Sequence, residues 1–327
     1  MADLLLSDDA GLACPRGGFY VDPWRPVPLA VLTHAHADHA RVGSARYIAT
    51  RESVPILRRR LGPDAVIDAV EYGQRIPLGD TIVSLHSAGH VLGSAQIRVE
   101  SGGETWLMTG DLKRDPDPTC APFEIVRADV IITEATFALP IYRWPDPVQV
   151  VDQLRERWKK DGLTVVFAYA LGKSQRILSM LGPDLPGPIY AHGAVRVVVD
   201  AYREAGVILP EVRPIEDKAA KKTMAGALVL APPSARGTPW MKRFSTATTA
   251  FASGWMQVRG DRRRRAIDLG MVLSDHADWP GLLRTIEDSG ATRVLLTHGH
   301  GEPLARWLRE QGKDATVMKT LFEGEAE

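Results

Sequence analysis

Short apolar runs separated by Gly, Pro and Asp turns make up most of the first third of the chain. Such spacing is typical of β-strands, and it predicts strands at 29–33, 46–49, 81–88, 95–100, 105–109 and 130–133. Residues 52–61 are the stretch of this region that predicts a helix. Several of the strands run directly into a loop rich in His or Asp. The pattern therefore predicts a sheet whose edge carries a site.

The periodicity changes near Pro145. Val151, Leu154 and Trp158 recur at helical spacing within 148–160, which predicts an amphipathic helix. Strands at 163–169, 189–191 and 227–231 then alternate with helices at 174–181 and 195–205. Residues 232–260 are rich in Ser, Thr, Gly and Pro and predict an ordered but irregular segment. Beyond them we expect strand 266–273, helix 279–289, strand 293–297 and helix 302–311.

These two patterns predict two structural units, for which 327 residues suffice. Because a strand and helix pattern resumes after the irregular segment, we expect one sandwich-like α/β domain interrupted by a smaller α/β insertion. The expected bounds are 1–145 and 261–327 for the sandwich and 146–260 for the insertion.

The charge balance does not indicate a polyanionic partner, since Lys plus Arg and Asp plus Glu both total 40. Basic residues nevertheless cluster at 58–60, 218–222 and 259–265. No apolar run approaches the ~20 residues of a membrane span. The first residues carry aspartates where an export signal would be positive, and Cys14 and Cys120 have no neighbour at metal-binding spacing. We therefore expect a cytoplasmic protein with reduced thiols and no membrane contact.

The strongest chemical signal follows the strand at 29–33, in a loop that contains His34, His36, Asp38 and His39. Imidazole and carboxylate groups suit zinc, manganese and similar divalent ions. So many ligands in so short a loop cannot all reach one ion. We expect His34 and His36 to face one ion and Asp38 and His39 to face another.

Three further residues at the ends of predicted strands would complete two sites. They are His90, Asp111 and His298. A carboxylate can bridge two ions, which suits Asp111. Each of the three alone is a common turn residue, and only together with the loop do they predict a two-metal centre.

The HxHxDH pattern of residues 34–39 resembles the hallmark of the metallo-β-lactamase superfamily. The resemblance implies an αββα sandwich that places two divalent metals, expected to be zinc or manganese, at one sheet edge. It also matches Asp22 to the superfamily's early aspartate, which supports the site from outside the metal ligands. The implied ligands are His34, His36 and His90 for one metal, Asp38, His39 and His298 for the other, and Asp111 bridging the two.

Two later segments, Thr133-Glu134-Ala135-Thr136-Phe137 and Ser274-Asp275-His276-Ala277-Asp278, resemble motifs of the superfamily's β-CASP branch of nucleic-acid-processing nucleases. That branch inserts an extra domain between these motifs, and Gly172-Lys173-Ser174-Gln175 resembles its start. The resemblance to the branch covers residues 20–312. Within the branch, the chain resembles most the bacterial DNA-ligase-associated exonucleases, relatives of the Artemis and Pso2 DNA-repair nucleases. The resemblance implies a DNA exonuclease, with DNA as substrate and with a DNA ligase and a helicase as partners.

Phosphodiester hydrolysis gives each motif residue a role. Two ions ~3.5–4 Å apart can generate hydroxide and neutralise the attacking and leaving oxygens, so a bridging Asp111 would be essential to catalysis. The leaving alkoxide needs a proton, for which His276 is the expected general acid. Glu134 is expected to hold it in the correct tautomer.

Substrate contacts are expected from the middle of the chain, where small residues permit close approach of phosphate. The candidates are Lys173, Ser234, Arg236 and Ser253. Aromatic side chains there could stack on bases, although packing in a core is their more frequent use. These aromatic candidates are Trp240, Phe244 and Trp255.

Three alternatives stay open from the sequence. Eukaryotic DNA-directed members often replace the last histidine motif with an apolar residue, whereas His298 is a histidine as in RNA-processing members, which keeps a ribonuclease in consideration. A small-molecule hydrolase of the glyoxalase II type would need the metal loop but neither Glu134 nor His276. A non-catalytic metal protein would predict an incomplete ligand set, and here every ligand position is filled.

Overall fold

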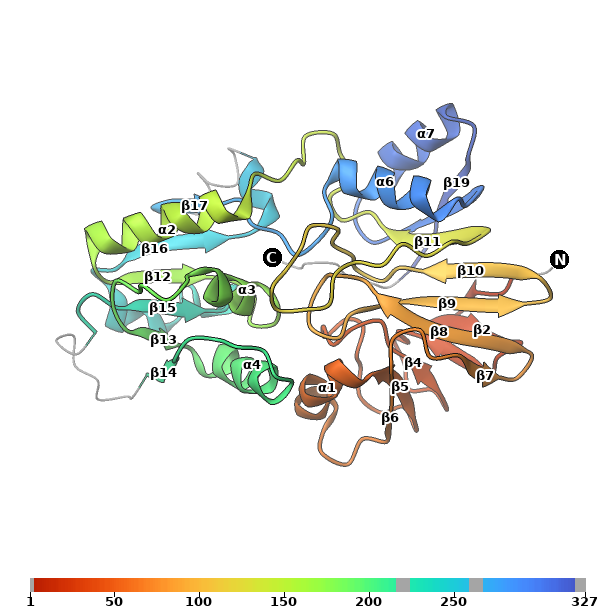
Figure 1. Cartoon of the computed structure of the whole chain (residues 1–327), viewed down its shortest axis with the longest axis horizontal. Helices are drawn as coiled ribbons and strands as arrows, with labels where there is room; N and C mark the ends of the chain where they lie inside the picture. Colours follow the sequence, from red (N-terminus) through yellow and green to blue (C-terminus); the bar gives the residue numbers. More distant parts are fainter. Residues whose placement is uncertain (1–2, 216–223, 259–266, 321–327) are drawn as a thin grey trace. The chain divides into compact units, whose positions relative to one another are not determined.

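The computed structural model describes residues 3–215, 224–258 and 267–320. The chain divides into two compact units. The first comprises the residues up to Tyr142 together with those from His276 onward, and the second comprises Arg143–Asp275. In Figure 1 the first unit runs from red to yellow and ends in blue, and the second is green to cyan. The basic clusters at 218–222 and 259–265, and with them the expected domain boundary at 260, lie outside the described residues.

Two mixed sheets form the first unit. One has the strand order β1-β2-β3-β4-β5-β6, with bounds Leu6–Ser7, Leu12–Cys14, Phe19–Val21, Ala30–Val31, Tyr47–Thr50 and Ile67–Val70. The other has the order β19-β18-β11-β10-β9-β8-β7. In chain order its strands are β7 (Ile76–Leu78), β8 (Thr81–Ser87), β9 (Ala95–Ser101), β10 (Glu104–Met108), β11 (Val130–Glu134), β18 (Arg293–Thr297) and β19 (Asp314–Val317).

The core of the first unit lies between these sheets. Val31 and Ile48 of the first sheet share one buried cluster with Val83 and Ile97 of the second, so the two sheets pack face to face. The outer face of the second sheet packs against helices α6 (Trp279–Ser289) and α7 (Glu302–Glu310). A turn of 3₁₀ helix, η1 (Arg51–Ser53), and helix α1 (Val54–Leu61) follow β5. The expected α/β sandwich is confirmed.

Three neighbouring parallel strands explain why chemical groups gather at one sheet edge. β10 pairs with β11, and β11 pairs with β18, both in parallel. Glu134 is in register with Thr297, and Asp111 follows the end of β10 by three residues. Because the carboxyl ends of parallel strands meet at the same edge, Asp111, Glu134 and His298 are brought together although they are far apart in the chain.

The second unit contains a six-stranded sheet whose pairings are all parallel, in the order β14-β13-β15-β12-β16-β17. Its strands are β12 (Thr164–Phe167), β13 (Ile189–Ala191), β14 (Arg213–Pro214), β15 (Leu228–Ala231), β16 (Thr248–Ala252) and β17 (Leu269–Met271). Its helices are α2 (Pro147–Asp161), α3 (Lys173–Met180) and α4 (Gly193–Glu204), with short 3₁₀ turns η2 (Pro233–Ala235), η3 (Pro239–Phe244) and η4 (Gly254–Gln257).

Two sequence predictions differ from this unit. The segment expected to be irregular contains strand β16, which is too short and too rich in Thr and Ala to stand out by periodicity. Strand β17 pairs with β16, so the second unit continues to Asp275 instead of ending near 260. No helix in the described part of the chain is both long and apolar enough to cross a membrane.

Candidate metal centre

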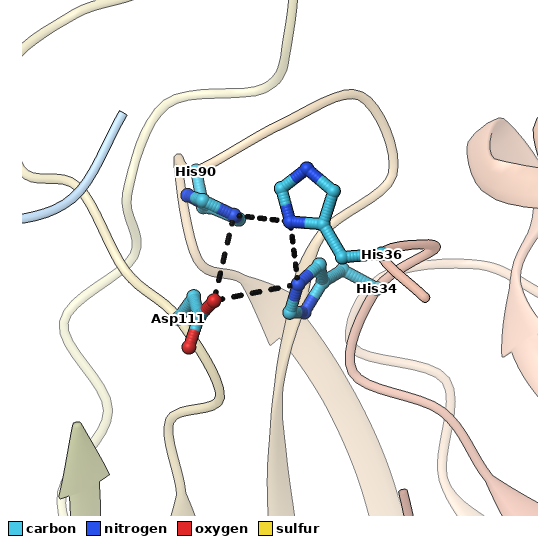
Figure 2. Close-up of side chains that lie close together, drawn as sticks. All are labelled: His34, His36, His90 and Asp111. Atoms are coloured by element: carbon cyan, nitrogen blue, oxygen red, sulfur yellow. Dashed lines mark hydrogen bonds and ion pairs between the residues drawn. The ribbon is translucent and has the colours of Figure 1, made fainter. Parts of the chain in front are cut away.

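Three histidine rings and one carboxylate converge in the first unit, as Figure 2 shows. His36 Nδ1 lies 3.0 Å from His34 Nε2 and 3.2 Å from His90 Nε2. Asp111 Oδ2 lies 3.5 Å from His34 Nε2 and 3.8 Å from His90 Nε2. Ligands about 2.0–2.1 Å from a tetrahedral zinc ion are separated by roughly 3.4 Å. These spacings therefore fit a single divalent ion.

A second group adjoins the first and shares Asp111 with it. His39 Nε2 lies 3.2 Å from His298 Nε2 and 3.5 Å from Asp38 Oδ2. Asp111 reaches this group too, with Oδ2 3.7 Å from His39 Nε2 and Oδ1 3.8 Å from His298 Nε2. The carboxylate of Asp111 thus faces both groups, which is the position required of a bridging ligand.

The chemistry of the two groups favours a cation over internal hydrogen bonding. Two ring nitrogens can hydrogen-bond only if one of them carries a proton, yet His36 Nδ1 faces two other ring nitrogens at short distance. Asp111 Oδ1 is buried and accepts no hydrogen bond from any described residue. Cations would satisfy these lone pairs together, so the residues present fit two divalent ions.

Buried polar residues behind the loop fix its shape. Asp22 has a positive φ of 42° and accepts from the Thr33 amide at 2.8 Å and from His39 Nδ1 at 2.7 Å. Thr33 Oγ1 also contacts Asp22, and it lies 3.0 Å from His34 Nδ1. Partners of this kind orient metal-binding imidazoles. The sequence predicted this position for Asp22, whereas Thr33 was missed because a threonine at a strand end carries no signal of its own.

A tight turn presents His90. Ser94 Oγ accepts from the amides of His90 at 3.0 Å and Val91 at 3.2 Å. The Ser94 carbonyl in turn accepts from the hydroxyl of Tyr72 at 3.0 Å. Gly93 has φ 73°, and a Cβ there would lie 2.3 Å from the Ser53 amide nitrogen, so only glycine fits this close approach. Neither Ser94 nor Tyr72 belongs to a recognisable motif.

Burial and charge shift the pKa values of the clustered groups in opposite directions. Burial raises the pKa of Asp111 to about 7, although the charge of His39 opposes the shift. Burial lowers the pKa of His39, but the carboxylates of Asp111 and Asp22 outweigh it and raise that pKa to about 9. Burial and neighbouring imidazoles hold the pKa values of His34 and His298 well below the ordinary range. Those two rings are therefore neutral near pH 7, as metal ligands must be.

A histidine–carboxylate pair borders the cluster. His276 Nδ1 lies 2.8 Å from Glu134 Oε2, and both side chains are buried. Glu134 Oε1 accepts from the amide of Leu112 at 2.8 Å. Because a carboxylate oxygen accepts, Nδ1 of His276 donates to Glu134, and Nε2 is the other ring nitrogen that can exchange a proton. The ring centroid of His276 lies 4.8 Å from that of His90.

The second unit corrects two of the expected substrate contacts. Lys173 is fully buried, with its ammonium 3.6 Å from Asp275 and over the ring of Tyr169. Ser253 is also buried, and its hydroxyl accepts from the amide of Trp255 at the start of η4. These side chains are occupied by the fold. Ser234 and Arg236 are exposed.

The aromatic candidates divide in the same way. Phe244 is buried in the hydrophobic cluster of the second unit, which contradicts its expected role in base stacking. Trp240 and Trp255 are half-buried. Both pack partly against that cluster.

Comparison with known proteins finds relatives of this chain by sequence. No protein-family model matches the chain. The chain is 32% identical over 314 residues to a protein of Opitutus terrae named as a probable DNA ligase, a match that covers 94% of this chain and 30% of that protein. It is 30% identical over 209 residues to a ribonuclease of Thermus thermophilus, covering 53% of this chain and 47% of the ribonuclease. An RNase J-like protein of Methanocaldococcus jannaschii is 23% identical over 220 residues, covering 57% of this chain and 52% of that protein.

The chain spans at most about half of the length of these relatives. A solved structure, a protein of unknown function from Enterococcus faecalis V583, matches 82% of this chain and 74% of its own with a TM-score of 0.55 and 14% identity. At that identity the match supports the fold alone.

Proposed function

Because the chain belongs to the β-CASP branch of the metallo-β-lactamase superfamily, we propose that it is a two-metal nuclease that hydrolyses phosphodiester bonds in DNA. The proposal includes action as an exonuclease in DNA repair and a location in the cytoplasm. The observation that carries it is the shared carboxylate of Asp111, which faces both candidate metal groups at 3.5–3.8 Å.

In this proposal each metal has its own histidines and Asp111 serves both. Zinc or manganese suits the nitrogen and oxygen donors. When bound, such a pair of ions would activate water and neutralise negative charge on the phosphate oxygens. The proposed ligands are His34, His36 and His90 for the first ion, Asp38, His39 and His298 for the second, and Asp111 for both.

The chain itself supplies the proton for the leaving group. Glu134 holds Nδ1 of His276 as a donor, so a protonated His276 presents its Nε2 proton to the leaving oxygen. Burial of the pair keeps the imidazole in one orientation. A thioester hydrolase would have less use for this pair, because its thiolate leaving group needs less help from an acid.

DNA is the proposed substrate on the strength of one relative. The Opitutus protein that matches 94% of this chain is named as a probable DNA ligase. Since the match covers 30% of that protein, most of that protein lies outside it. A nuclease segment within a ligase would process DNA ends before they are joined, and we propose a DNA ligase and a helicase of the same pathway as partners.

A ribonuclease is the second candidate, favoured by two observations. His298 lies among the candidate ligands, and in RNA-processing members of the branch the corresponding motif is a histidine. Several relatives of part of the chain are named as ribonucleases or endoribonucleases.

The deciding experiment uses end-labelled single-stranded DNA and RNA of matched sequence, with manganese, zinc or magnesium added singly. The proposal expects DNA to be consumed faster than RNA and nucleotides to be released progressively from one end. Internal RNA fragments of defined length with intact DNA would replace the proposal by the second candidate. Absence of cleavage of either polymer with every metal would reject the nuclease itself.

A further inference from the structure

A basic and aromatic surface lies at one edge of the sheet in the second unit. Because all pairings in this sheet are parallel, the loops that follow β13 and β15 emerge at the same edge. His192 follows β13, and the segment from Arg236 to Arg243 follows β15. We call this the carboxyl-edge surface, and it consists of His192, Arg236, Trp240, Lys242 and Arg243.

The charge of this surface has one sign. From Met224 to Val258 the chain contains Arg236, Lys242 and Arg243 and no acidic residue, although acids and bases balance over the whole chain. Arg236 and Lys242 are exposed and form no ion pair with any described residue. Two exposed cations without an ion-pair partner among the described residues are suited to binding a polyanion.

The aromatic part of the surface is held in place. The ring centroid of Trp240 lies 5.1 Å from that of His192 at an interplanar angle of 69°. It also lies 4.8 Å from that of the buried Phe244. The guanidinium of Arg243 is 5.9 Å from the Trp240 centroid. A half-buried indole fixed by neighbouring rings loses little conformational entropy when a flat group stacks on it.

His192 contributes shape more than charge. Its Nδ1 accepts from the amide of Ala194 at the start of α4, and partial burial lowers its pKa. The ring is therefore neutral near pH 7, and the positive charge of the surface comes from Arg236, Lys242 and Arg243.

We propose that the carboxyl-edge surface binds a single strand of nucleic acid. Phosphates lie on Arg236 and Lys242, and a base stacks against Trp240 beside the guanidinium of Arg243. Alternation of cations with an aromatic platform is the arrangement that recognises a single strand without reading its sequence. An acidic peptide would use the cations but not the indole. The inference rests on the proposed nuclease function, to which it adds a strand-binding region outside the metal centre.

The test measures binding apart from hydrolysis. The whole chain is titrated into a fluorescein-labelled single-stranded oligodeoxynucleotide in the presence of EDTA, with an oligoribonucleotide as a second probe. Trp240→Ala should weaken binding by about 5-fold to 100-fold, whereas Trp240→Phe, which keeps a stacking ring, should retain most of the affinity. The double variant Arg236→Gln/Lys242→Gln should lower the slope of log affinity against log salt by about 1.4.

The matched control removes the same charge elsewhere in the unit. Lys159 and Lys160 are exposed at the end of α2, and Lys159→Gln/Lys160→Gln should leave the affinity and its salt slope nearly unchanged. Equal effects of the two double variants would overturn the proposal, because the binding would then follow net charge alone. Retained affinity in Trp240→Ala would overturn it as well, as would an acidic peptide that competes with the oligonucleotide and is equally sensitive to Trp240→Ala.

Hydrolysis of bis(4-nitrophenyl) phosphate with added manganese separates this inference from the proposed function. All variants of the carboxyl-edge surface should hydrolyse this small diester as the unmodified chain does. Hydrolysis without any effect of the surface variants on oligonucleotide binding would reject the inference and keep the nuclease. Oligonucleotide binding that depends on Trp240, without hydrolysis of any phosphodiester, would keep the strand-binding surface and reject the nuclease.

Discussion

Both units bury ionisable side chains, but they balance the buried charge in different ways. In the second unit, Lys173 and Arg176 lie 3.6 and 3.9 Å from Asp275, and all three are nearly inaccessible to solvent. Charge of each sign is present, and Arg176 also donates to the Ser274 carbonyl at 2.7 Å. The first unit instead crowds imidazoles around Asp111, with ring nitrogens facing one another.

This difference separates a structural cluster from a functional one. A buried charge that the protein itself compensates is part of the fold. Lone pairs that converge without enough protons or cations among the described residues point to a ligand from outside. The sequence predicted that Lys173 contacts phosphate, whereas in the structure it belongs to the buried cluster whose charge Asp275 compensates.

The largest expected effect removes the carboxylate that both metal groups share. Asp111→Ala should lower phosphodiester hydrolysis by at least about 10³-fold, since both ions lose a ligand. Metal content by mass spectrometry under native conditions should fall in parallel. Asp64 is exposed in the same unit and provides the control. Asp64→Ala should keep both the hydrolysis rate and the metal content of the unmodified chain. Substantial turnover in Asp111→Ala would remove this residue from the bridging position.

The second prediction concerns His276. His276→Ala should bind metal normally and lose about 10²–10⁴-fold in rate on an oligonucleotide. The loss of rate should shrink on a nitrophenyl phosphodiester, because its leaving group needs little proton assistance. Glu134→Gln should show the same pattern more weakly. Equal losses on both substrates would refute the general-acid role.

A second histidine–glutamate pair supplies the control for that experiment. His86 Nδ1 lies 2.8 Å from Glu124 Oε1, the same separation as in the His276 pair, but Glu124 is exposed. His86 Nε2 contacts Ser84, and His86 is not among the candidate ligands. His86→Ala should leave the rate on both substrates nearly unchanged.

The third prediction tests the structural cluster. Asp275→Asn should destabilise the protein by about 3–5 kcal/mol, because it leaves the buried Lys173 and Arg176 without their carboxylate. Asp152, whose side chain is exposed beside Arg155 at 4.0 Å, offers the control, and Asp152→Asn should change stability by less than about 0.5 kcal/mol. Denaturant unfolding measures both. A loss of stability as small as that of Asp152→Asn would show that Asp275 does not stabilise the fold by compensating the buried Lys173 and Arg176.

The fourth prediction concerns support of the metal ligands. Thr33→Val keeps the shape of the side chain but removes the hydroxyl that contacts Asp22 and His34. Metal affinity should fall by about 10–100-fold, and Thr33→Ser, which restores the hydroxyl, should recover most of it. Competition with a chromophoric chelator measures the affinity. Similar losses of metal affinity in Thr33→Val and Thr33→Ser would show that the effect comes from packing and not from the hydroxyl.

The smallest expected effect is the pH dependence of metal affinity, which arises from titratable groups of the first unit. The raised pKa values, about 7 for Asp111 and about 9 for His39, mean that a metal displaces protons from both groups below pH 7 and from His39 alone between pH 7 and 9. Log affinity for manganese should therefore rise by about 2 per pH unit below pH 7 and by about 1 up to pH 9, then level off.

Thermal unfolding gives a second reading of the same linkage. A raised pKa in the folded state stabilises the metal-free protein at low pH, and this stabilisation is lost as pH rises through about 7 for Asp111 and about 9 for His39. The difference in Tm between metal-loaded and metal-free protein should widen from pH 6 to pH 9. A constant difference would show that metal binding releases no protons from these groups.

The sequence by itself determined the elements with strong periodicity and the local metal motif. Helix α2 and strand β8 follow their predicted positions closely, because hydrophobic spacing is a property of a short segment. The loop from His34 to His39 and the strand-end residues Asp111 and His298 likewise carry their chemistry locally.

Tertiary structure decided which of the remaining candidates the fold leaves accessible. Lys173 and its partner Asp275 are about a hundred residues apart, Thr33 became a support residue only through its contact with Asp22, and β16 became a strand through pairing with β12. Burial and partnership depend on segments that are distant in the chain. Local patterns contain the ligand chemistry, and only packing determines whether a side chain is already occupied.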